Sequence, residues 1–212
     1  MARIVKAEAK PTLAEAVAVL KGGGLVVYPS DTVYGLAAAA SDERAVGRVF
    51  AVKGRDVEKA LSLLLADAAD LEHLCAEVPL LARVLADRYW PGPLTLVLRR
   101  SPDFRSAALG GGDTVAVRVP DHPFLRKLIR ALGEPITGTS ANRSGRPACR
   151  SAQEVERELG DAVELIIDGG PSRAGPESTV VDVTSGLPVI LREGAIPRAD
   201  VERLGRTGIA TV

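Results

Sequence analysis

Short apolar runs alternate with amphipathic segments along most of this chain, and this alternation limits the fold to the α/β class. The runs have the length of strands, are bounded by glycine, proline or polar residues, and cover residues 25–29, 60–67, 93–100, 114–120, 163–170, 179–184 and 188–194. Helical periodicity marks residues 12–24, 41–55, 77–90, 122–133 and 151–160. The pattern predicts a sheet with flanking helices.

Two neighbouring runs argue against a purely parallel sheet. Residues 93–100 and 114–120 are connected through the glycine-rich residues 109–113, with no helical segment between them. Such a connection is typical of antiparallel strands, so we expect strands of mixed direction. No internal repeat, low-complexity tract or shift of composition divides the chain, and residues 1–212 are therefore expected to form one domain.

Charge and composition exclude several classes of function. Lysine plus arginine and aspartate plus glutamate number 27 each, so the net charge gives no argument for a nucleic-acid or membrane partner. Two histidines and two cysteines are too few for a histidine-rich zinc site or a disulfide framework. Because the sequence shows no secretory leader and no apolar run of spanning length, we expect a cytoplasmic protein without membrane contact.

The ends of the predicted helices allow expectations about individual residues. Thr12 and His122 each precede an amphipathic segment and are expected to cap it. The segment at residues 41–55 has its apolar residues on one face, which suits a helix packed on a sheet. Its last turn delivers Lys53 and Arg55 to the following loop.

Hydroxyl groups and cations gather in the loops between the predicted strands. Each one alone is usually a capping residue or a solvated charge. Together they are typical of a phosphate site, because ammonium and guanidinium groups neutralise phosphate while hydroxyls and amides bind its other oxygens. We therefore expect a nucleoside triphosphate to be bound by residues drawn from Thr32, Lys53, Arg55, Ser140, Asn142, Ser178, Thr179 and Arg192.

The sequence lacks the familiar motifs of nucleotide binding and nucleophilic catalysis. It has no G-x-x-x-x-G-K-[ST] and no G-x-G-x-x-G between strand and helix, and the glycines at 22–24 follow a helix instead of preceding one. Ser140 and Ser178 have neither a G-x-S-x-G context nor an evident histidine partner. A reaction that needs only orientation and charge neutralisation fits better, such as adenylation of the substrate's own oxyanion.

Six ordered blocks resemble the YrdC-like family, and within it the TsaC-type threonylcarbamoyl-adenylate synthases. The blocks are "YPSDTVYGL", "KGR" with "KALSLLLAD", "WPGPLTLVL", "VAVRVPDHP", "TSANRSGRP", and "ESTVVDVT" with "ILREGAI". The resemblance implies a twisted mixed α/β sheet with flanking helices and a large open basic cavity. It also implies synthesis of threonylcarbamoyl-AMP from L-threonine, bicarbonate and ATP, with release of pyrophosphate, for the threonylcarbamoyladenosine modification of tRNA.

The resemblance also implies a role for individual residues. Lys53 and Arg55 are implied to be the catalytic pair, acting on phosphates and carboxylates. Threonine is implied to contact Thr32, Arg55 and Ser178, with Asp31 orienting the turn that presents Thr32. The nucleotide is implied to contact Lys53, Arg55, Lys59, Ser140, Asn142 and Arg192. No protein metal site is expected, and Mg²⁺ is expected to arrive with ATP.

The chain departs from the family pattern around the basic pair and the first turn. Ser30 stands where the family usually has threonine, which keeps the hydroxyl group. Asp56 and Ala60 stand where prolines are usual, so Asp56 is placed to pair with Arg55 and the loop is expected to be looser. We expect Arg55→Lys to slow the reaction more than Lys53→Arg, because arginine alone donates two parallel hydrogen bonds.

Partners and alternatives follow from the same resemblance. The chain resembles the single-domain form of the family and is expected to act before a tRNA-modifying transferase complex. One alternative is an RNA-binding YrdC-like module, with weak binding through the arginines of residues 143–150, although aromatic residues for base stacking are sparse. The other is a different carbamoyl-adenylating enzyme, since YrdC-like domains also occur in larger hydrogenase-maturation proteins that use carbamoyl phosphate.

Overall fold

The computed structural model describes residues 2–9, 11–172 and 176–209. None of the helices in these ranges combines the length and the hydropathy that a membrane span requires. The elements in chain order are β1 (Arg3–Lys6), α1 (Thr12–Lys21), β2 (Val26–Tyr28), β3 (Gly35–Ala37), α2 (Glu43–Lys53), β4 (Ser62–Leu64), η1 (Ala68–Asp70), α3 (Leu71–Leu74), α4 (Leu80–Tyr89), β5 (Leu94–Arg99), η2 (Ala107–Leu109), β6 (Thr114–Arg118), α5 (Pro123–Leu132), β7 (Ile136–Ser140), α6 (Ala152–Leu159), β8 (Leu165–Asp168), β9 (Thr179–Asp182), β10 (Val189–Arg192) and α7 (Arg198–Ile209).

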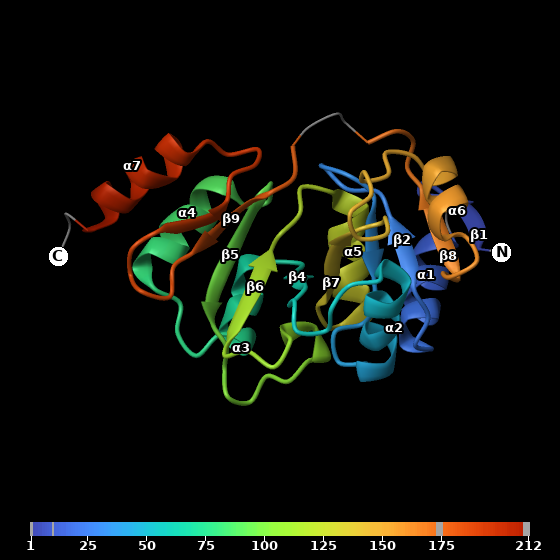
Figure 1. Cartoon of the computed structure of the whole chain (residues 1–212), viewed down its shortest axis with the longest axis horizontal. Helices are drawn as coiled ribbons and strands as arrows, with labels where there is room; N and C mark the ends of the chain where they lie inside the picture. The colour runs from blue at the N-terminus through green and yellow to red at the C-terminus, as the bar shows by residue number, and fades with distance from the viewer. Residues whose placement is uncertain (1, 10, 173–175, 210–212) are drawn as a thin grey trace.

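The strands of the described residues form a ten-stranded sheet in the order β1-β8-β2-β3-β7-β4-β6-β5-β9-β10 (Figure 1). The parallel neighbours are β1 and β8, β8 and β2, β4 and β6, and β5 and β9. The other neighbours are antiparallel, among them β5 and β6, in which Leu96 lies opposite Val117. The predicted mixed α/β sheet is therefore confirmed.

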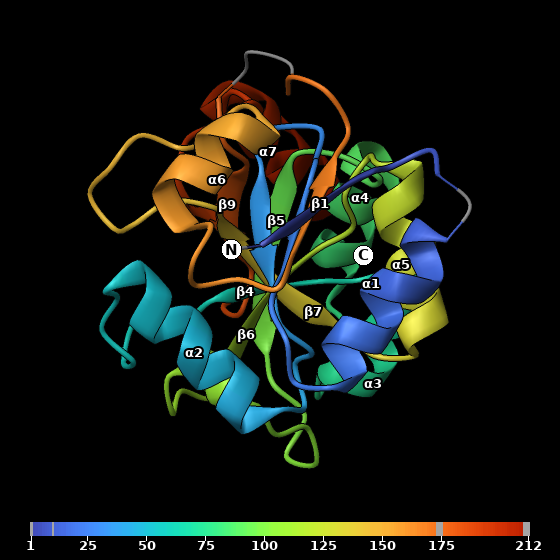
Figure 2. The same ribbon diagram turned by 90° about the vertical axis from the view of Figure 1, so that its right-hand side faces the viewer.

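Helices cover both faces of the sheet, as the end-on view shows (Figure 2). Because successive strand residues point to opposite faces, β2 contributes Val26 to one core and Val27 to the other. The core with Val26 includes Leu20 of α1 and Leu128 of α5, two helices that pack together. The core with Val27 includes residues of α2 and α6, which lie on the other side of the strands in Figure 2.

Helix α2 lies within the predicted segment 41–55, with Lys53 in its last turn and Arg55 just beyond its end. The Asp42 carboxylate accepts a hydrogen bond from the Ala45 amide at 2.9 Å, which satisfies a free donor of the first turn. Gly54 ends the helix in the left-handed conformation, with φ at 59°, which glycine adopts without strain. The buried Val46 and Val49 hold the helix against the sheet, and this packing fixes the position of its last residue, Lys53.

Of the two expected helix caps, Thr12 is wrong, and His122 is confirmed in position only. Pro11 occupies the N-cap position of α1, and the hydroxyl of Thr12 instead donates a hydrogen bond to the Lys6 carbonyl at 2.7 Å. This bond joins the start of α1 to β1, a strand that the hydrophobic pattern does not predict. His122 does occupy the N-cap position of α5, but its side chain makes no capping hydrogen bond.

Candidate active site

The turn between β2 and β3 presents two hydroxyl groups to a cavity. Ser30 organises the turn, since its hydroxyl donates to the Val33 carbonyl at 2.6 Å and accepts from the Thr32 amide at 3.2 Å. Gly35 is needed at the start of β3, because a Cβ there would clash with the ring of Tyr28, which is buried. Ser30 therefore serves the backbone of the turn, and its hydroxyl also lies 3.1 Å from the buried hydroxyl of Thr32.

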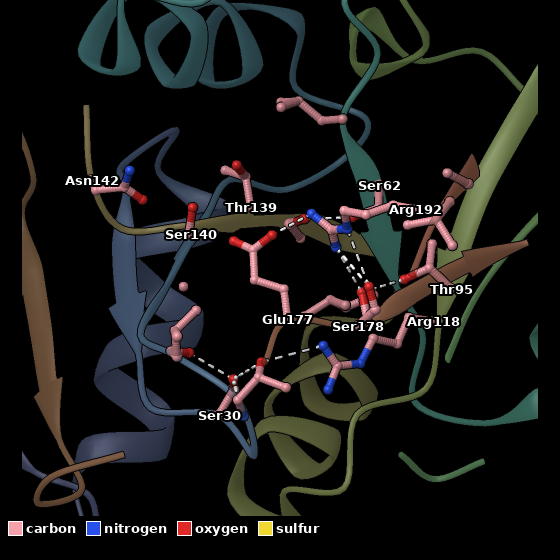
Figure 3. A pocket seen from close by; sticks show the side chains of 18 of the residues that line it. Ser30, Ser62, Thr95, Arg118, Thr139, Ser140, Asn142, Glu177, Ser178 and Arg192 are labelled. Carbon is pink, nitrogen blue, oxygen red and sulfur yellow. Dashed lines mark hydrogen bonds and ion pairs between the residues drawn. The ribbon is translucent and has the colours of Figure 1, made fainter. Parts of the chain in front are cut away.

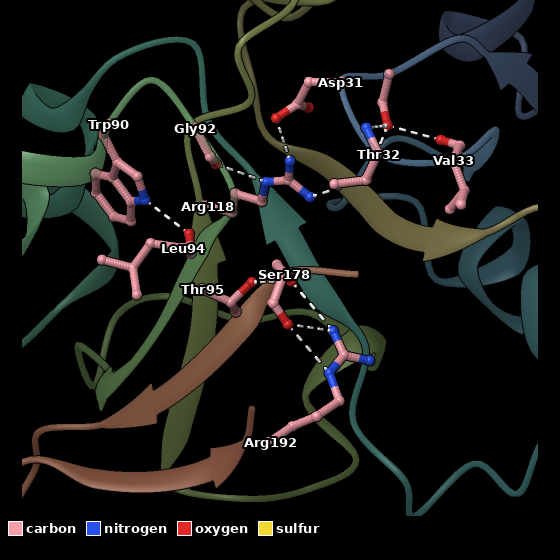
Figure 4. A network of polar contacts seen from close by, with 11 residues as sticks. Asp31, Thr32, Val33, Trp90, Gly92, Leu94, Thr95, Arg118, Ser178 and Arg192 are labelled. Carbon is pink, nitrogen blue, oxygen red and sulfur yellow. Dashed lines mark hydrogen bonds and ion pairs between the residues drawn. The ribbon is translucent and has the colours of Figure 1, made fainter. Parts of the chain in front are cut away.

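A buried ion pair joins this turn to β6. The Arg118 guanidinium donates to the Asp31 carboxylate at 2.6 Å, to the Gly92 carbonyl at 2.9 Å and to the Thr32 hydroxyl at 3.4 Å (Figure 4). The Arg118 and Asp31 side chains are only 10% and 15% exposed. Asp31 thereby holds the turn against the sheet. Because a guanidinium has five N–H groups, Arg118 retains donors for a ligand in the cavity that it lines.

The Lys53 side chain holds a neighbouring loop. Its ammonium group donates to the carbonyl oxygens of Ser140 at 2.5 Å and Asn142 at 2.8 Å, while its own carbonyl accepts from the Ser144 amide at 2.8 Å. Burial, and to a smaller extent the neighbouring Arg55 guanidinium, lowers the pKa of Lys53 from 10.5 to about 8. Lys53 thus uses most of its hydrogen-bonding capacity on the loop from Ser140 to Ser144.

Arg55 uses its guanidinium to close the loop that follows α2. It donates to the backbone carbonyls of Lys59 and Ala60, each at 2.9 Å. The expected pair between Arg55 and Asp56 is not formed in the described residues, because the Asp56 carboxylate accepts from the Glu58 amide at 3.1 Å. Arg55 lines the cavity, whereas Lys59 is exposed to solvent and is not one of the lining residues that the structure describes.

Ser140 and Asn142 lie at the end of β7 and line the same cavity. The side-chain amide of Asn142 donates to the carbonyls of Arg143 and Arg146 at 3.0 and 2.6 Å. Its side-chain oxygen is buried and has no hydrogen-bond partner in the described part of the chain. The Asn142 side chain therefore shapes the loop around it, in addition to any contact with a ligand.

Ser178 contacts one residue of β5 and one residue of β10. Its hydroxyl lies 2.9 Å from the Thr95 hydroxyl on β5. Arg192, the last residue of β10, donates to the Ser178 carbonyl at 2.9 and 3.2 Å and to the Ser178 hydroxyl at 3.1 Å (Figure 4). The same guanidinium forms an ion pair with Glu177 (Figure 3). Part of the loop before this segment, residues 173–175, lies outside the described residues.

These side chains surround one cavity of about 540 Å³, which is in the usual size range of small-ligand sites. The predicted site residues Thr32, Lys53, Arg55, Ser140, Asn142, Ser178 and Arg192 line it, and so does Arg118. Lys59 and Thr179 are not among the described lining residues. Thr179 is buried, and its hydroxyl donates to the Ile196 carbonyl at 2.7 Å. The described lining contains four basic side chains, all of which also bind protein groups, and one carboxylate, that of Glu177. The described ranges contain no group of three or more His, Cys, Asp and Glu residues that could hold a metal ion. A large open basic cavity stays a prediction.

Sequence reasoning missed several polar residues that line this cavity. Arg118 has a detectable signal, because a charged residue inside the apolar run of β6 must find a partner when it is buried. Thr95 is a polar residue within β5, and the sequence does not reveal its neighbour across the sheet. Glu177 has no distinguishing signal, since a glutamate in a loop is usually a solvated charge. The missed lining residues include Tyr28, Thr95, Arg118, Thr139 and Glu177.

The fold and the site together define an α/β protein in which a mixed sheet holds a cavity lined by hydroxyl groups and cations, a lining that suits an anionic ligand. The chain belongs to the Sua5/YciO/YrdC family. The model of this family, described as telomere recombination, matches residues 18–194.

Comparison with known proteins agrees with this assignment. The chain is 46% identical over 185 residues to a threonylcarbamoyl-AMP synthase of Pyrococcus abyssi, and the match covers 87% of this chain and 54% of that protein. It is 42% identical over 187 residues to a threonylcarbamoyl-AMP synthase of Vibrio cholerae, with 86% and 97% covered. The crystal structure of P. abyssi Sua5 complexed with L-threonine matches with a TM-score of 0.89 and 43% identity, over 96% of this chain and 60% of that one. The chain thus spans about half the length of the Pyrococcus relative.

Proposed function

We propose that this chain synthesises threonylcarbamoyl-AMP from L-threonine, bicarbonate and ATP and releases pyrophosphate. The observation that most supports this is the convergence of residues from distant segments on one cavity. The names of the Pyrococcus and Vibrio relatives, and the binding of L-threonine by P. abyssi Sua5, add support. The residues that converge are Thr32, Lys53, Arg55, Ser140, Asn142, Ser178 and Arg192.

The amino acid is proposed to bind at Thr32, Arg118 and Ser178. A guanidinium forms strong charge-assisted bonds to a carboxylate, and Arg118 keeps donors for this after its bonds to Asp31 and Gly92. The hydroxyls of Thr32 and Ser178 supply hydrogen bonds to a polar side chain. Arg55, which the resemblance also implies for threonine, donates two hydrogen bonds to the carbonyls of its own loop and keeps its remaining N–H groups for phosphate.

The nucleotide is proposed to bind between β7 and β10. Arg192 and Arg55 would neutralise phosphate oxygens, while Ser140 and Asn142 form the polar wall beside them. Lys53 would support this wall through its bonds to the two carbonyls and would have one remaining N–H group for phosphate. Lys59, exposed in this structure, would need to move in order to reach the same phosphates.

The proposed chemistry requires no protein nucleophile. The amino group of threonine attacks the carbon of bicarbonate and water leaves, which gives a carbamate. A carbamate oxygen then attacks the α-phosphorus of ATP, the bond to the β-phosphate oxygen breaks, and pyrophosphate leaves with the bonding electrons. Positioned cations lower this barrier by neutralising the charge that develops on the phosphates.

Mg²⁺ is proposed to enter with the triphosphate. The described lining offers a single carboxylate, which is too little for a dedicated protein site but fits a metal held mainly by phosphate oxygens. When bound, the metal would neutralise charge on the leaving pyrophosphate. Full activity in excess chelator would contradict this part of the proposal.

The product is proposed to be used by a tRNA-modifying transferase complex in the cytoplasm, which would pass the threonylcarbamoyl group to an adenosine of tRNA. Direct RNA binding and use of carbamoyl phosphate are the alternatives, and no contact among the described residues favours either of them. Adenylate formation from carbamoyl phosphate and ATP, without threonine, would support the second alternative.

A pyrophosphate-release assay tests the proposal directly. Purified protein is supplied with MgATP, L-threonine and bicarbonate, and each component is then omitted in turn. We expect release only when all of them are present, because the carbamate is the nucleophile toward phosphorus. Release that is undiminished without threonine would contradict the proposed reaction.

A further inference from the structure

Glu177 is a carboxylate in a cavity whose other charged lining residues, among those the structure describes, are basic. An α-amino acid enters such a cavity as a zwitterion. Its carboxylate is attracted by the guanidinium groups of Arg118 and Arg192, but its ammonium group is repelled by them. A site for an amino acid therefore needs a group that accepts hydrogen bonds from the ammonium and offsets this repulsion. Glu177 is the charged side chain in the described lining with that property.

The present partner of Glu177 can be exchanged at low cost. Glu177 and Arg192 are paired, and their side chains are 45% and 47% exposed. The pair between Asp31 and Arg118 is far more buried, with side chains 15% and 10% exposed. Because exposed ion pairs contribute little to stability, a ligand with charges of both signs can replace the first pair much more easily than the second.

Backbone contacts fix the position of Glu177 in the lining of the cavity. Its carbonyl accepts a hydrogen bond from the Ala195 amide at 2.9 Å, and Gly194 allows the two segments to approach because a Cβ there would clash with the Glu177 carbonyl. The next residue is Ser178, a proposed contact of the amino acid. In Figure 3 the Glu177 side chain extends into the space between Ser140 and Arg192.

Building on the proposed function, we propose that Glu177 binds the ammonium group of the amino-acid substrate. In doing so it releases Arg192, which then binds the phosphates of the nucleotide. The amino acid therefore strengthens nucleotide binding, and the nucleotide strengthens amino-acid binding by the same factor, as linkage requires.

Binding measurements on Glu177→Gln test this proposal. Isothermal titration uses three probes: L-threonine, 2,3-dihydroxybutanoate, which has a hydroxyl in place of the ammonium, and the Mg²⁺ complex of an ATP analogue with a methylene group between its α- and β-phosphates. The substitution should weaken L-threonine binding about tenfold to hundredfold, the range for a hydrogen bond to a charged group. It should leave dihydroxybutanoate binding unchanged or tighter. L-threonine should tighten analogue binding in the parent protein but not in the variant.

Glu164→Gln is the matched control. Glu164 pairs with Arg48 at 2.7 Å, and the two side chains are 44% and 41% exposed, close to the values for Glu177 and Arg192. Glu164 does not line the cavity in the described residues, so this variant should bind all three probes like the parent. Glu177→Asp, which keeps the charge, should recover part of the preference for L-threonine over dihydroxybutanoate.

The outcomes separate this proposal from the proposed function. A folded Glu177→Gln that binds L-threonine as the parent does would overturn the role of Glu177 and leave the proposed function standing. Loss of affinity for the magnesium analogue alone would also overturn it, since the carboxylate would then be a metal ligand. A parent protein that neither binds L-threonine nor releases pyrophosphate would overturn both proposals.

Discussion

Lys53 and Ser140 are joined by a 2.5 Å hydrogen bond from the lysine ammonium group to the serine carbonyl oxygen. A second bond reaches the Asn142 carbonyl at 2.8 Å, and the lysine is only 3% exposed. This arrangement makes Lys53 a support of the loop that follows β7. It also changes what substitutions at the basic pair are expected to do.

Lys53→Arg is expected to be more damaging than Arg55→Lys, the reverse of the order expected from the hydrogen-bonding capacity of the two side chains alone. The bulkier guanidinium must fit where a buried ammonium now reaches two carbonyls, and such overpacking costs about 1–3 kcal/mol. Arg55→Lys affects a half-buried residue whose bonds close an exposed loop. Urea unfolding and pyrophosphate release of both variants test this order. A Lys53→Arg protein with the stability and rate of the parent would contradict the supporting role.

The lowered pKa of Lys53 predicts a stability change at high pH. The pKa is about 8 in the folded protein, against 10.5 ordinarily. Between these two pH values the unfolded chain binds more protons at this group than the folded protein does. The contribution of Lys53 to the free energy of unfolding therefore rises as pH increases from about 8 to 10.5. The same contribution is lost when pH falls back toward 8. Urea unfolding of the parent and of Lys53→Met at several pH values measures the difference. An equal pH dependence of the two proteins in this window would show that Lys53 titrates normally.

Breaking the buried ion pair between Asp31 and Arg118 is expected to be costly. Asp31→Ala leaves a buried guanidinium without its carboxylate, which typically lowers the free energy of unfolding by about 3–5 kcal/mol. Glu164→Gln, which breaks a half-exposed pair with Arg48, should cost about 1 kcal/mol or less. Chemical denaturation of both variants makes the comparison. Similar small losses in the two would mean that Arg118 does not depend on Asp31.

Gly35→Ala is expected to disturb the turn that presents Thr32. The added methyl group would clash with the buried ring of Tyr28, at a cost of about 1–3 kcal/mol, and should weaken L-threonine binding by moving the turn. Gly47→Ala is the control, because nothing lies within 4 Å of its added Cβ and alanine favours the interior of α2. Thermal unfolding should therefore separate the two variants in opposite directions. Equal stability of the two would refute the close-contact explanation.

The fold class was predictable because it depends on long patterns. The helices α1, α2, α4, α5 and α6 and most strands coincide with segments of clear periodicity. The strands β1, β3 and β7 were not predicted individually. Strand β3 has three residues and β1 has exposed and half-buried ones, so neither shows a reliable alternation. They belong to the sheet because of their neighbours, such as β8 for β1, and this pairing is invisible in the local sequence.

The sequence indicated several residues that belong to the site but not which groups they contact. Thr32, Ser178 and Arg192, which the resemblance implies as ligand contacts, line the cavity. The resemblance relates whole blocks and not single side chains. It gave no sign that Lys53 donates to backbone carbonyls, since any residue type can supply a carbonyl. The pairing of Glu177 with Arg192 likewise depends on how the segment before β9 lies beside the end of β10.

The most direct test of the central claim is the mass of the nucleotide product. The purified protein is incubated with MgATP, L-threonine and either ordinary or ¹³C-labelled bicarbonate, and the nucleotides are analysed by mass spectrometry. We expect threonylcarbamoyl-AMP, heavier by one mass unit when the bicarbonate is labelled, because the carbamoyl carbon comes from it. A folded protein that forms no such adenylate, or whose adenylate does not take up the label, would contradict the proposed synthesis.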